Sequence, residues 1–185
     1  MQANGTRNSI IFKESFDKND WLYEGQHGFR PGYSCESQVI TVCQDIADFI
    51  DNGDRNDAIV IDFSKAFDLV PYDRLLMKIA ISGLDSRIVA WVREFILCRT
   101  QRVKVGGQLS EEVRVTSGVP QGSVLGPLLF LAYVNNIRRN TMSTMRLFAN
   151  DCVIYRKIIS NEDIENLQKV LDRLGEWAGE NAMKI

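Results

Sequence analysis

The stretch 58–63 constrains the fold of this chain most, because it is a continuous apolar run interrupted by a single acid. It reads Ala-Ile-Val-Ile-Asp-Phe, and its β-branched residues favour a strand. A continuous apolar run, as opposed to an alternating one, is typical of a strand buried on both faces. We therefore predict a buried strand within a sheet, with Asp62 standing at the end of that strand.

The composition is that of a globular chain. Of 185 residues, 45% are hydrophobic and 25% are charged, which is enough to build a sizeable core. There is no repeat, low-complexity tract or linker, so we expect one compact unit. His27 is the only histidine, which excludes zinc sites that need several histidines. A bound metal ion would therefore have to sit on carboxylates.

The cysteines and the apolar segments indicate a soluble protein of a reducing compartment. No two cysteines lie close enough in sequence to form a zinc-binding or redox pair. The longest apolar stretch, 125–134, is half the length that a bilayer span needs, and the first residues lack the pattern of a secretory signal. We expect an intracellular protein with no membrane partner. The cysteines are Cys35, Cys43, Cys98 and Cys152.

Hydrophobic periodicity predicts helices separated by two hairpins. We expect Ser86 to be the N-cap of the second helix of a helical pair, and Ser160 with Asp163 to form a capping box at the start of the last helix. The first helix should bury one face, made of Val39, Val42, Cys43, Ile46 and Ile50. The predicted helices are 35–51, 72–82, 86–97, 124–136 and the segment after Ser160, and the hairpins pair 102–105 with 113–115 and 145–149 with 152–155.

Basic side chains gather in one part of a chain whose net charge is −2. Residues 99–139 hold six basic and two acidic side chains, and the basic residues of the first hairpin should share one of its faces. This surplus could face phosphate groups. It could also form a solvated charged surface, and charge alone favours that interpretation.

Three features do not look like simple packing: Asp62 after its strand, the turn-rich loop 117–123, and Asp151 at the tip of the second hairpin. Two carboxylates at one sheet edge suit Mg²⁺ or Mn²⁺ and nucleotidyl transfer. Each acid could also have a purely structural role. Asn150 and Asp151 could simply favour positive φ at a tight turn. Asp62 could be an acid at the end of a strand that caps a turn. An unrelated carboxylate-metal nuclease would not account for the Pro120-Gln121 loop.

Four ordered segments resemble the motifs of a known family. Segments 58–68 (AIVIDFSKAFD), 117–127 (SGVPQGSVLGP) and 148–151 (FAND) look like motifs A, B and C of reverse transcriptases. Segment 26–34 (QHGFRPGYS) looks like the fingers motif that precedes motif A. The resemblance is strongest to the polymerase of non-LTR (LINE-type) retrotransposons, and it covers residues 20–185.

The resemblance implies an α+β fold, a right-hand polymerase palm with part of the fingers, in which an antiparallel sheet is backed by helices. Residues 1–20 would be an N-terminal remnant of the fingers and 21–185 the fingers and palm, truncated at both ends, with the thumb absent. The implied partners are an RNA template, a DNA primer, dNTPs and an endonuclease domain in the full-length polypeptide. The implied location is the nucleus and cytoplasm.

The resemblance also implies the catalytic groups. Asp62 and Asp151 would hold the metal ions, while Asn150 stands where the family has its first motif C aspartate. An amide oxygen is a neutral and weaker ligand than a carboxylate, so we expect a rate at least about a hundred-fold lower. The alternative function is a catalytically inactive, nucleic-acid-binding remnant of a degenerate element.

Further residues are implied at the nucleotide. Phe67 would be the steric gate that selects deoxynucleotides, although a core phenylalanine fits the pattern equally well. Gln121 would contact the nucleotide and template, and Asp68 would support the motif A turn or cap the next helix. Arg30 would touch phosphate, with an ordinary surface arginine as the default. The main-chain N–H groups of Phe63, Ser64, Lys65 and Ala66 would line the triphosphate.

Overall fold

A computed structural model describes residues 12, 14, 21–138 and 141–185. The chain forms two compact units, where the sequence predicts one. The sheet unit comprises Leu22–Ala66 and Val134–Ile185, and the helical unit comprises Phe67–Tyr133. The chain crosses from one unit to the other without an intervening linker. The amino-acid composition therefore gives no sign of where one unit ends and the other begins. The proposed fingers remnant, residues 1–20, lies almost wholly outside the described residues.

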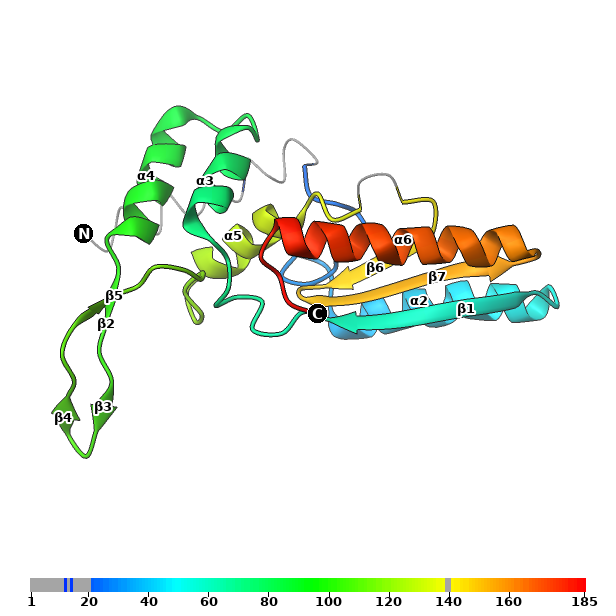
Figure 1. Cartoon of the computed structure of the whole chain (residues 1–185), viewed down its shortest axis with the longest axis horizontal. Coiled ribbons are helices and arrows are strands. Elements are labelled where there is room, and N and C mark those ends of the chain that lie inside the picture. The colour runs from blue at the N-terminus through cyan, green and yellow to red at the C-terminus, as the bar shows by residue number, and fades with distance from the viewer. Residues whose placement is uncertain (1–11, 13, 15–20, 139–140) are drawn as a thin grey trace. The chain divides into compact units, whose positions relative to one another are not determined.

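The sheet unit is a three-stranded antiparallel sheet with a helix on each face (Figure 1). The strands are β1 (Arg55–Asp62), β6 (Thr144–Phe148) and β7 (Asp151–Ile158), in the order β1-β7-β6. Helix α6 (Asn161–Glu180) packs on β7, and α2 (Cys35–Asp51) packs on β1 and β6. The predicted mixture of helices and antiparallel sheet is confirmed.

The strand β1 is an edge strand, so the prediction that it is buried on both faces is wrong. Only Ile61 is buried along β1, and the side chain of Val60 is 76% exposed. The central position belongs to β7, whose Cys152, Ile154 and Tyr155 are fully buried. An apolar run shows that a strand could be buried. Which strand is buried on both faces depends on the order of the strands in the sheet, and here that strand is β7.

Helix α2 has the predicted bounds but presents a different face to the sheet. Val39 and Ile50 of the predicted apolar face are 54% and 66% exposed, and Gln38 is the buried residue of this helix. Asp45 fixes the orientation, because its carboxylate accepts hydrogen bonds from Arg146 and from the Tyr155 hydroxyl group. The helix thus meets the sheet through a charged pair, a contact that hydrophobic periodicity does not predict.

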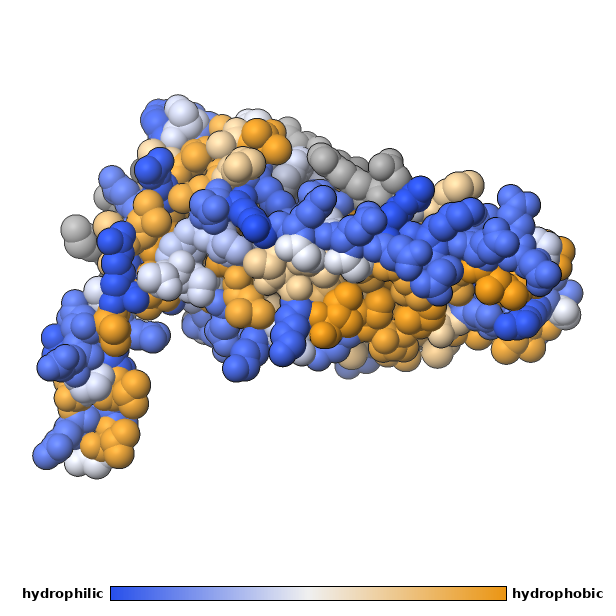
Figure 2. Space-filling view, in the orientation of Figure 1, coloured by the Kyte–Doolittle hydropathy of each residue, from blue (hydrophilic) through white to orange (hydrophobic). Residues whose placement is uncertain are grey.

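Helix α6 follows its sequence pattern. Leu167, Leu174 and Ala178 are buried against the sheet, while hydrophilic side chains cover the outward face (Figure 2). The predicted capping box is confirmed: the Asp163 carboxylate accepts the Ser160 N–H at 3.1 Å. The segment after α6 returns to the end of β1, where the Ser64 N–H donates to the Lys184 carbonyl oxygen.

The helical unit contains α3 (Tyr72–Ala80), α4 (Ser86–Leu97) and α5 (Leu125–Val134). The last residue of α5, Val134, belongs to the sheet unit. Asp85, not Ser86, is the N-cap of α4, and its carboxylate accepts the Arg87 N–H at 2.8 Å. A hairpin forms where the sequence predicts one, but the predicted pairing of 102–105 with 113–115 is wrong. The strand β2 (Thr100–Gln101) pairs with β5 (Val113–Arg114), and β3 (Lys104–Val105) pairs with β4 (Gln108–Leu109) across the Gly106-Gly107 turn.

No helix in the described part of the chain is long and apolar enough to cross a membrane. The cysteines are all free thiols, and Cys152 is buried in β7 while Cys35, Cys43 and Cys98 are exposed.

Candidate active site

The strands β1 and β7 bring Asp62 and Asp151 together. In the antiparallel register, Asp62 is the direct partner of Asp151, although 89 positions separate them in the chain (151 − 62). Partners in an antiparallel ladder project to the same face of the sheet, and both side chains are exposed. The two carboxylates therefore stand side by side at one end of the sheet, as the sequence predicts.

The turn between β6 and β7 consists of Ala149 and Asn150, since Phe148 and Asp151 pair across it. Ala149 takes positive φ, at 56°, and neither Asn150 nor Asp151 does. The idea that Asn150 and Asp151 are there to adopt positive φ is therefore wrong. The strained position is held by an alanine, which disfavours this conformation, and Asp151 is the first residue of β7 and not the tip of the turn.

Asn150 contacts the carboxylate pair directly. Its Nδ2 donates a hydrogen bond to Asp62 Oδ1 at 2.6 Å. A carboxylate in the same place would repel Asp62 in the absence of a cation, whereas the amide N–H is attracted to it. Asn150 thus acts in this structure as a donor toward the group that the resemblance makes a metal ligand.

Asp62 influences the ionisation of Asp151. Partial burial raises the pKa of Asp151 above its ordinary value, and the negative charge of Asp62 and a hydrogen bond between the two carboxyl groups raise it further. Two carboxylates this close resist being ionised together unless positive charge is added. The pair is therefore a site that a cation would stabilise.

Gln26 and Gly28 hold the turn, and sequence reasoning gave neither a role at the site. The Gln26 Oε1 accepts the N–H groups of Gly28 and Ala149, both at 2.8 Å, and its Nε2 donates to the Ala149 carbonyl oxygen at 3.2 Å. Gln26 is 3% exposed, so these bonds are shielded from water. A side-chain atom on Gly28 would lie 2.2 Å from the Ala149 nitrogen. The signal available in the sequence was a Gln-x-Gly within the fingers motif.

The turn after β1 places the predicted nucleotide-binding segment. The Phe63 N–H donates to the Asn150 carbonyl oxygen at 3.4 Å and the Ser64 N–H to the Lys184 carbonyl oxygen at 2.7 Å, so both groups are already used within the protein. Lys65 is exposed and takes positive φ, at 49°, while Ala66 is buried. Main-chain contacts to a triphosphate would therefore have to come from Lys65 onward.

Phe67 and Asp68 begin the helical unit. The Phe67 ring is half-buried and stacks on Phe130, with centroids 4.4 Å apart and planes 15° apart. This contact fits a core phenylalanine. Asp68 does not cap α3, whose N-cap is Pro71. The main-chain oxygen of Asp68 instead accepts a hydrogen bond from the Ser117 hydroxyl group at 2.9 Å, which ties motif A to motif B.

Gln121 lies in the helical unit, exposed at the rim of a groove of about 470 Å³. Its loop depends on Gly118, which has φ of 85° and where a Cβ atom would lie 2.8 Å from the Asp68 carbonyl oxygen. The structure thus gathers Gln121 and Asp68 around one groove in the helical unit and Asp62 and Asp151 at one end of the sheet unit.

Arg30 is held by its own loop. Its Nη1 donates to the carbonyl oxygens of Tyr23 at 3.0 Å and Gln26 at 3.3 Å, and its guanidinium group lies 4.9 Å from the centre of the Tyr33 ring. These contacts brace the fingers motif around Gln26. They give Arg30 a structural role within its loop, and a contact with phosphate stays a prediction.

The donors at the end of the sheet suit a hard divalent cation. Mg²⁺ is commonly bound by one or two carboxylates, with water and substrate phosphates completing an octahedron. Asp62 and Asp151 supply two carboxylates on one face, and their mutual repulsion favours a cation between them. Within the described residues, no group of three or more His, Cys, Asp or Glu side chains gathers to enclose a metal ion. The pair would therefore share an ion with other oxygen donors.

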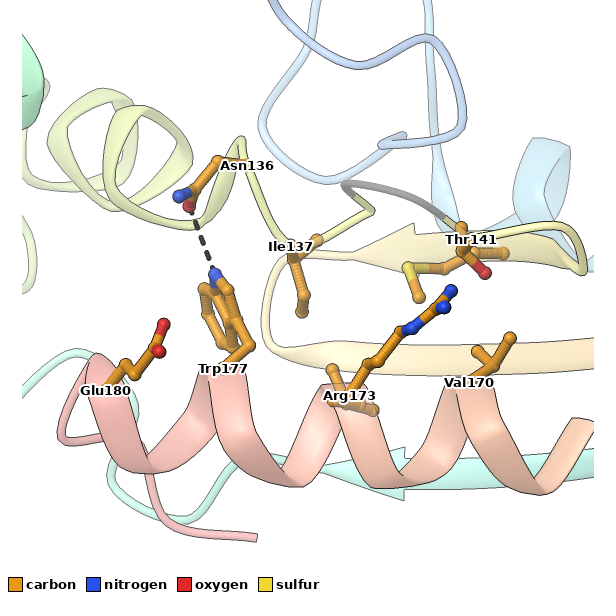
Figure 3. A pocket seen from close by; sticks show the side chains of 9 residues that line it. Asn136, Ile137, Thr141, Val170, Arg173, Trp177 and Glu180 are labelled. Carbon is orange, nitrogen blue, oxygen red and sulfur yellow. Dashed lines mark hydrogen bonds between the residues drawn. The ribbon is translucent and has the colours of Figure 1, made fainter.

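A cavity of about 180 Å³ lies on the other side of the sheet, under α6 (Figure 3). Met145 of β6 lines this cavity, and Met145 pairs with Ile154 of β7. Ile154 and Asp151 are three residues apart in β7, so their side chains project to opposite faces of the sheet. The Trp177 indole N–H donates to Asn136 Oδ1 at 3.1 Å across this cavity. The cavity is a packing feature behind the sheet and is separate from the carboxylates.

Comparison with known proteins identifies the family. The family described as "Reverse transcriptase (RNA-dependent DNA polymerase)" matches residues 8–185. The chain is 31% identical over 161 residues to the probable RNA-directed DNA polymerase from transposon X-element of Drosophila melanogaster, and 29% identical over 162 residues to the RNA-directed DNA polymerase from mobile element jockey of the same species. These matches cover 84% and 83% of this chain and 18% of each relative, so the chain spans about a fifth of their length.

Solved structures support the fold. The chain is similar to apo telomerase from Candida tropicalis truncated from its C-terminal domain, with a TM-score of 0.66 at 12% identity, over 92% of this chain and 36% of that one. It is also similar to Candida albicans telomerase in complex with a fragment of telomeric RNA, with a TM-score of 0.62 at 13% identity, over 91% and 32%. At this identity the likeness concerns the fold alone. Together with the family match, these findings show that the chain belongs to the reverse transcriptase family and is a domain of the LINE-type, non-LTR retrotransposon class.

Proposed function

We propose that this chain forms the palm and part of the fingers of an RNA-directed DNA polymerase from a non-LTR retrotransposon, without the thumb of a right-hand polymerase. The observation that carries the proposal is the register of β1 and β7, which sets Asp62 beside Asp151 at one end of the sheet. The fold shared with telomerase and the family match support it. Its partners would be an RNA template, a DNA primer and dNTPs, within a longer polypeptide that includes an endonuclease domain, in the nucleus and cytoplasm.

The reaction is a nucleotidyl transfer. The primer 3′-hydroxyl oxygen forms a bond to the α-phosphorus of a dNTP, the bond to pyrophosphate breaks, and the hydroxyl proton leaves to solvent. Bound Mg²⁺ or Mn²⁺ supplies activation of the hydroxyl group and neutralises charge on the phosphates. Asp62 and Asp151 would hold these ions, and the exposed turn that begins at Lys65 would face the triphosphate. Phe67 would pack under the sugar and Gln121 would contact the nucleotide and template.

Asn150 lowers the activity that we propose. Its amide N–H occupies Asp62 Oδ1, and its own oxygen is a neutral ligand where the family has an anionic one. Phosphoryl transfer depends mainly on positioning and charge stabilisation, so a misplaced ion costs rate directly. We expect a rate at least about a hundred-fold below that of an otherwise identical chain with aspartate at this position.

Primer extension tests the proposal. The chain as given, Asn150→Asp and Asp62→Asn/Asn150→Asp are compared on a poly(rA) template with an oligo(dT) primer, dTTP and MgCl₂. We expect Asn150→Asp to extend the primer, the chain as given to extend it at least about a hundred-fold more slowly, and the Asp62 variant to be inactive. If none of the three extends the primer while Asn150→Asp is folded and binds the primer–template, the polymerase assignment for these residues is wrong.

The hydrogen bond between Asn150 and Asp62 also favours a second function, that of an inactive remnant that still binds nucleic acid. Binding of an RNA–DNA hybrid that weakens with salt, without incorporation by the chain as given, supports this function. Extension by the chain as given at the rate of Asn150→Asp would contradict it.

A further inference from the structure

The segment 99–116, here called the hairpin arm, extends from the helices of its unit as a thin ribbon (Figure 1). All its residues from Thr100 to Arg114 are exposed. Its strands are two residues long, and a two-stranded ribbon of this kind has little stability of its own in water. The hairpin arm therefore contributes surface and not core, so its role has to be sought in the chemistry of that surface.

The exposed surface of the hairpin arm combines basic and apolar side chains. Thr100 pairs with Arg114, so these two side chains project to one face, and farther out Lys104 pairs with Leu109. The Arg102 guanidinium group meets Glu112 at 3.0 Å. Val103, Val105 and Val113 are exposed as well, and both hydrophilic and hydrophobic colours are visible on the hairpin arm in Figure 2. Two residues on one side of the ribbon (102–103) face three on the other (110–112), so the register changes between the two strand pairs and a single face for the basic side chains stays a prediction.

The charge of the hairpin arm opposes that of the whole chain. It holds four basic and two acidic side chains, in a chain of net charge −2. The pair between Arg102 and Glu112 is half exposed, and such pairs contribute little, so an anion can replace the carboxylate at small cost. The hairpin arm contains no aromatic residue on which bases could stack. This chemistry suits a phosphate backbone without regard to base sequence.

The base of the hairpin arm continues into the proposed template site. Arg99, Gln101 and Arg114 line the groove of about 470 Å³ that also contains Gln121. Arg99 Nη1 donates to the Gly118 carbonyl oxygen at 3.1 Å, which connects the hairpin arm to the loop of Gln121. A strand that lies at Gln121 is thus adjacent to the basic side chains at the base of the hairpin arm.

We propose that the hairpin arm binds the phosphate backbone of the nucleic acid whose bases lie at the Gln121 loop. The proposal rests on the proposed function, and it assigns to the hairpin arm a sequence-independent grip on that strand. Arg99 and Arg114 hold the backbone at the groove, and Arg102 and Lys104 hold it farther along the hairpin arm. The exposed valines Val103 and Val105 make no contact with the nucleic acid.

A salt titration of binding tests this assignment. Binding of a fluorescein-labelled RNA–DNA hybrid is followed by anisotropy from 50 to 300 mM KCl for the chain as given and for Arg102→Gln/Lys104→Gln. The matched control is Arg87→Gln/Lys169→Gln, which removes the same charges from two exposed residues, one of them an arginine that is also paired with a carboxylate. We expect the hairpin-arm variant to bind about tenfold more weakly at 100 mM KCl, with a log–log salt slope smaller by about 2. The control should change affinity less than about twofold.

Two further variants separate charge from folding. Arg102→Lys/Lys104→Arg keeps the charges and should keep the salt slope, whereas Val103→Ser/Val105→Ser should leave affinity unchanged. The proposal is overturned if the hairpin-arm and control variants behave alike, or if only the valine variant loses affinity, which would assign the hairpin arm to an apolar partner. If the chain as given binds the hybrid and the hairpin-arm variant binds it equally well, this inference fails and the proposed function stands. If the chain as given binds no hybrid at 50 mM KCl, both fail.

Discussion

The substitution Gly28→Ala should destabilise the sheet unit through the turn that carries Asn150. An added Cβ atom at Gly28 would lie 2.2 Å from the Ala149 nitrogen, 2.9 Å from the Ala149 Cα and 3.0 Å from Gln26 Oε1. The two closest atoms belong to the main chain, so no side-chain rotation can relieve the overlap. Either the fingers loop or the turn between β6 and β7 must move.

The cost follows from the contacts that would be disturbed. Overpacking by one methyl group costs about 1–3 kcal/mol. Separating Gln26 from Ala149 would also leave buried polar groups without partners, at about 1–3 kcal/mol for each group. Replacing glycine with alanine restricts the unfolded chain, which offsets about 0.4–1 kcal/mol. We expect the free energy of unfolding to fall by about 2–4 kcal/mol for Gly28→Ala.

Urea unfolding monitored by circular dichroism at 222 nm measures this change. The control is Gly175→Ala in α6, where an added Cβ atom would meet nothing within 4 Å. Alanine in a helix is favoured over glycine, so this variant should be more stable by about 0.5–1 kcal/mol. Neutral surface changes typically alter the free energy of unfolding by no more than about 0.5 kcal/mol. If the free energy of unfolding of Gly28→Ala differs from that of the unmodified chain by no more than this, the idea that Gly28 and Gln26 hold the turn at Ala149 is refuted.

Three other predictions concern charge and burial. Asn150→Asp removes the donor to Asp62 and adds a third carboxylate, so the melting temperature should fall without metal, and 5 mM MgCl₂ should raise it more than in the unmodified chain; equal shifts in thermal scans would contradict a metal site at this pair. Burial raises the pKa of Tyr155 to about 12, above its value of about 10 in an unfolded chain. The unfolded state therefore loses this proton first, and stability should be constant below about pH 10 and fall between about 10 and 12. Tyr155→Phe should show a smaller loss of urea midpoint from pH 9 to 11, and an unchanged loss would show that Tyr155 does not contribute. Burial raises the pKa of the Cys152 thiol to about 12, so a thiol reagent should modify three cysteines quickly and Cys152 only in urea, whereas rapid modification of all four would contradict its burial.

Local pattern predicted the helices and the second hairpin well, because their signals are contained in consecutive residues, whereas the pairing within the first hairpin was predicted wrongly. The bounds of α2 and α4 and the capping box of α6 agree with the sequence. The orientation of α2 could not be predicted, since it depends on Asp45 meeting Arg146, 101 positions away. The exposure of Val60 could not be predicted either, because the composition of β1 does not specify which strands lie beside it.

The candidate site divides in the same way. Motif resemblance indicated Asp62 and Asp151, and the register of β1 and β7 makes them neighbours. The supporting contacts of Gln26 were missed, because they join segments 123 positions apart and involve main-chain groups that any residue would offer. The positive φ of Ala149 was missed for a related reason, since alanine gives no turn signal and the neighbouring asparagine seemed to provide one.

The hydrogen bond from Asn150 to Asp62 separates the stability of this site from its activity. Burial and the nearby charge of Asp62 already raise the pKa of Asp151. A third carboxylate would add repulsion that only bound cations relieve, whereas the Asn150 amide donates to Asp62 without any cation. We therefore expect asparagine, compared with aspartate at this position, to favour the folded chain in the absence of metal and to weaken the proposed binding of metal ions. Loss of polymerase activity in such a chain would leave the fold intact, and retained folding is by itself no sign of retained catalysis.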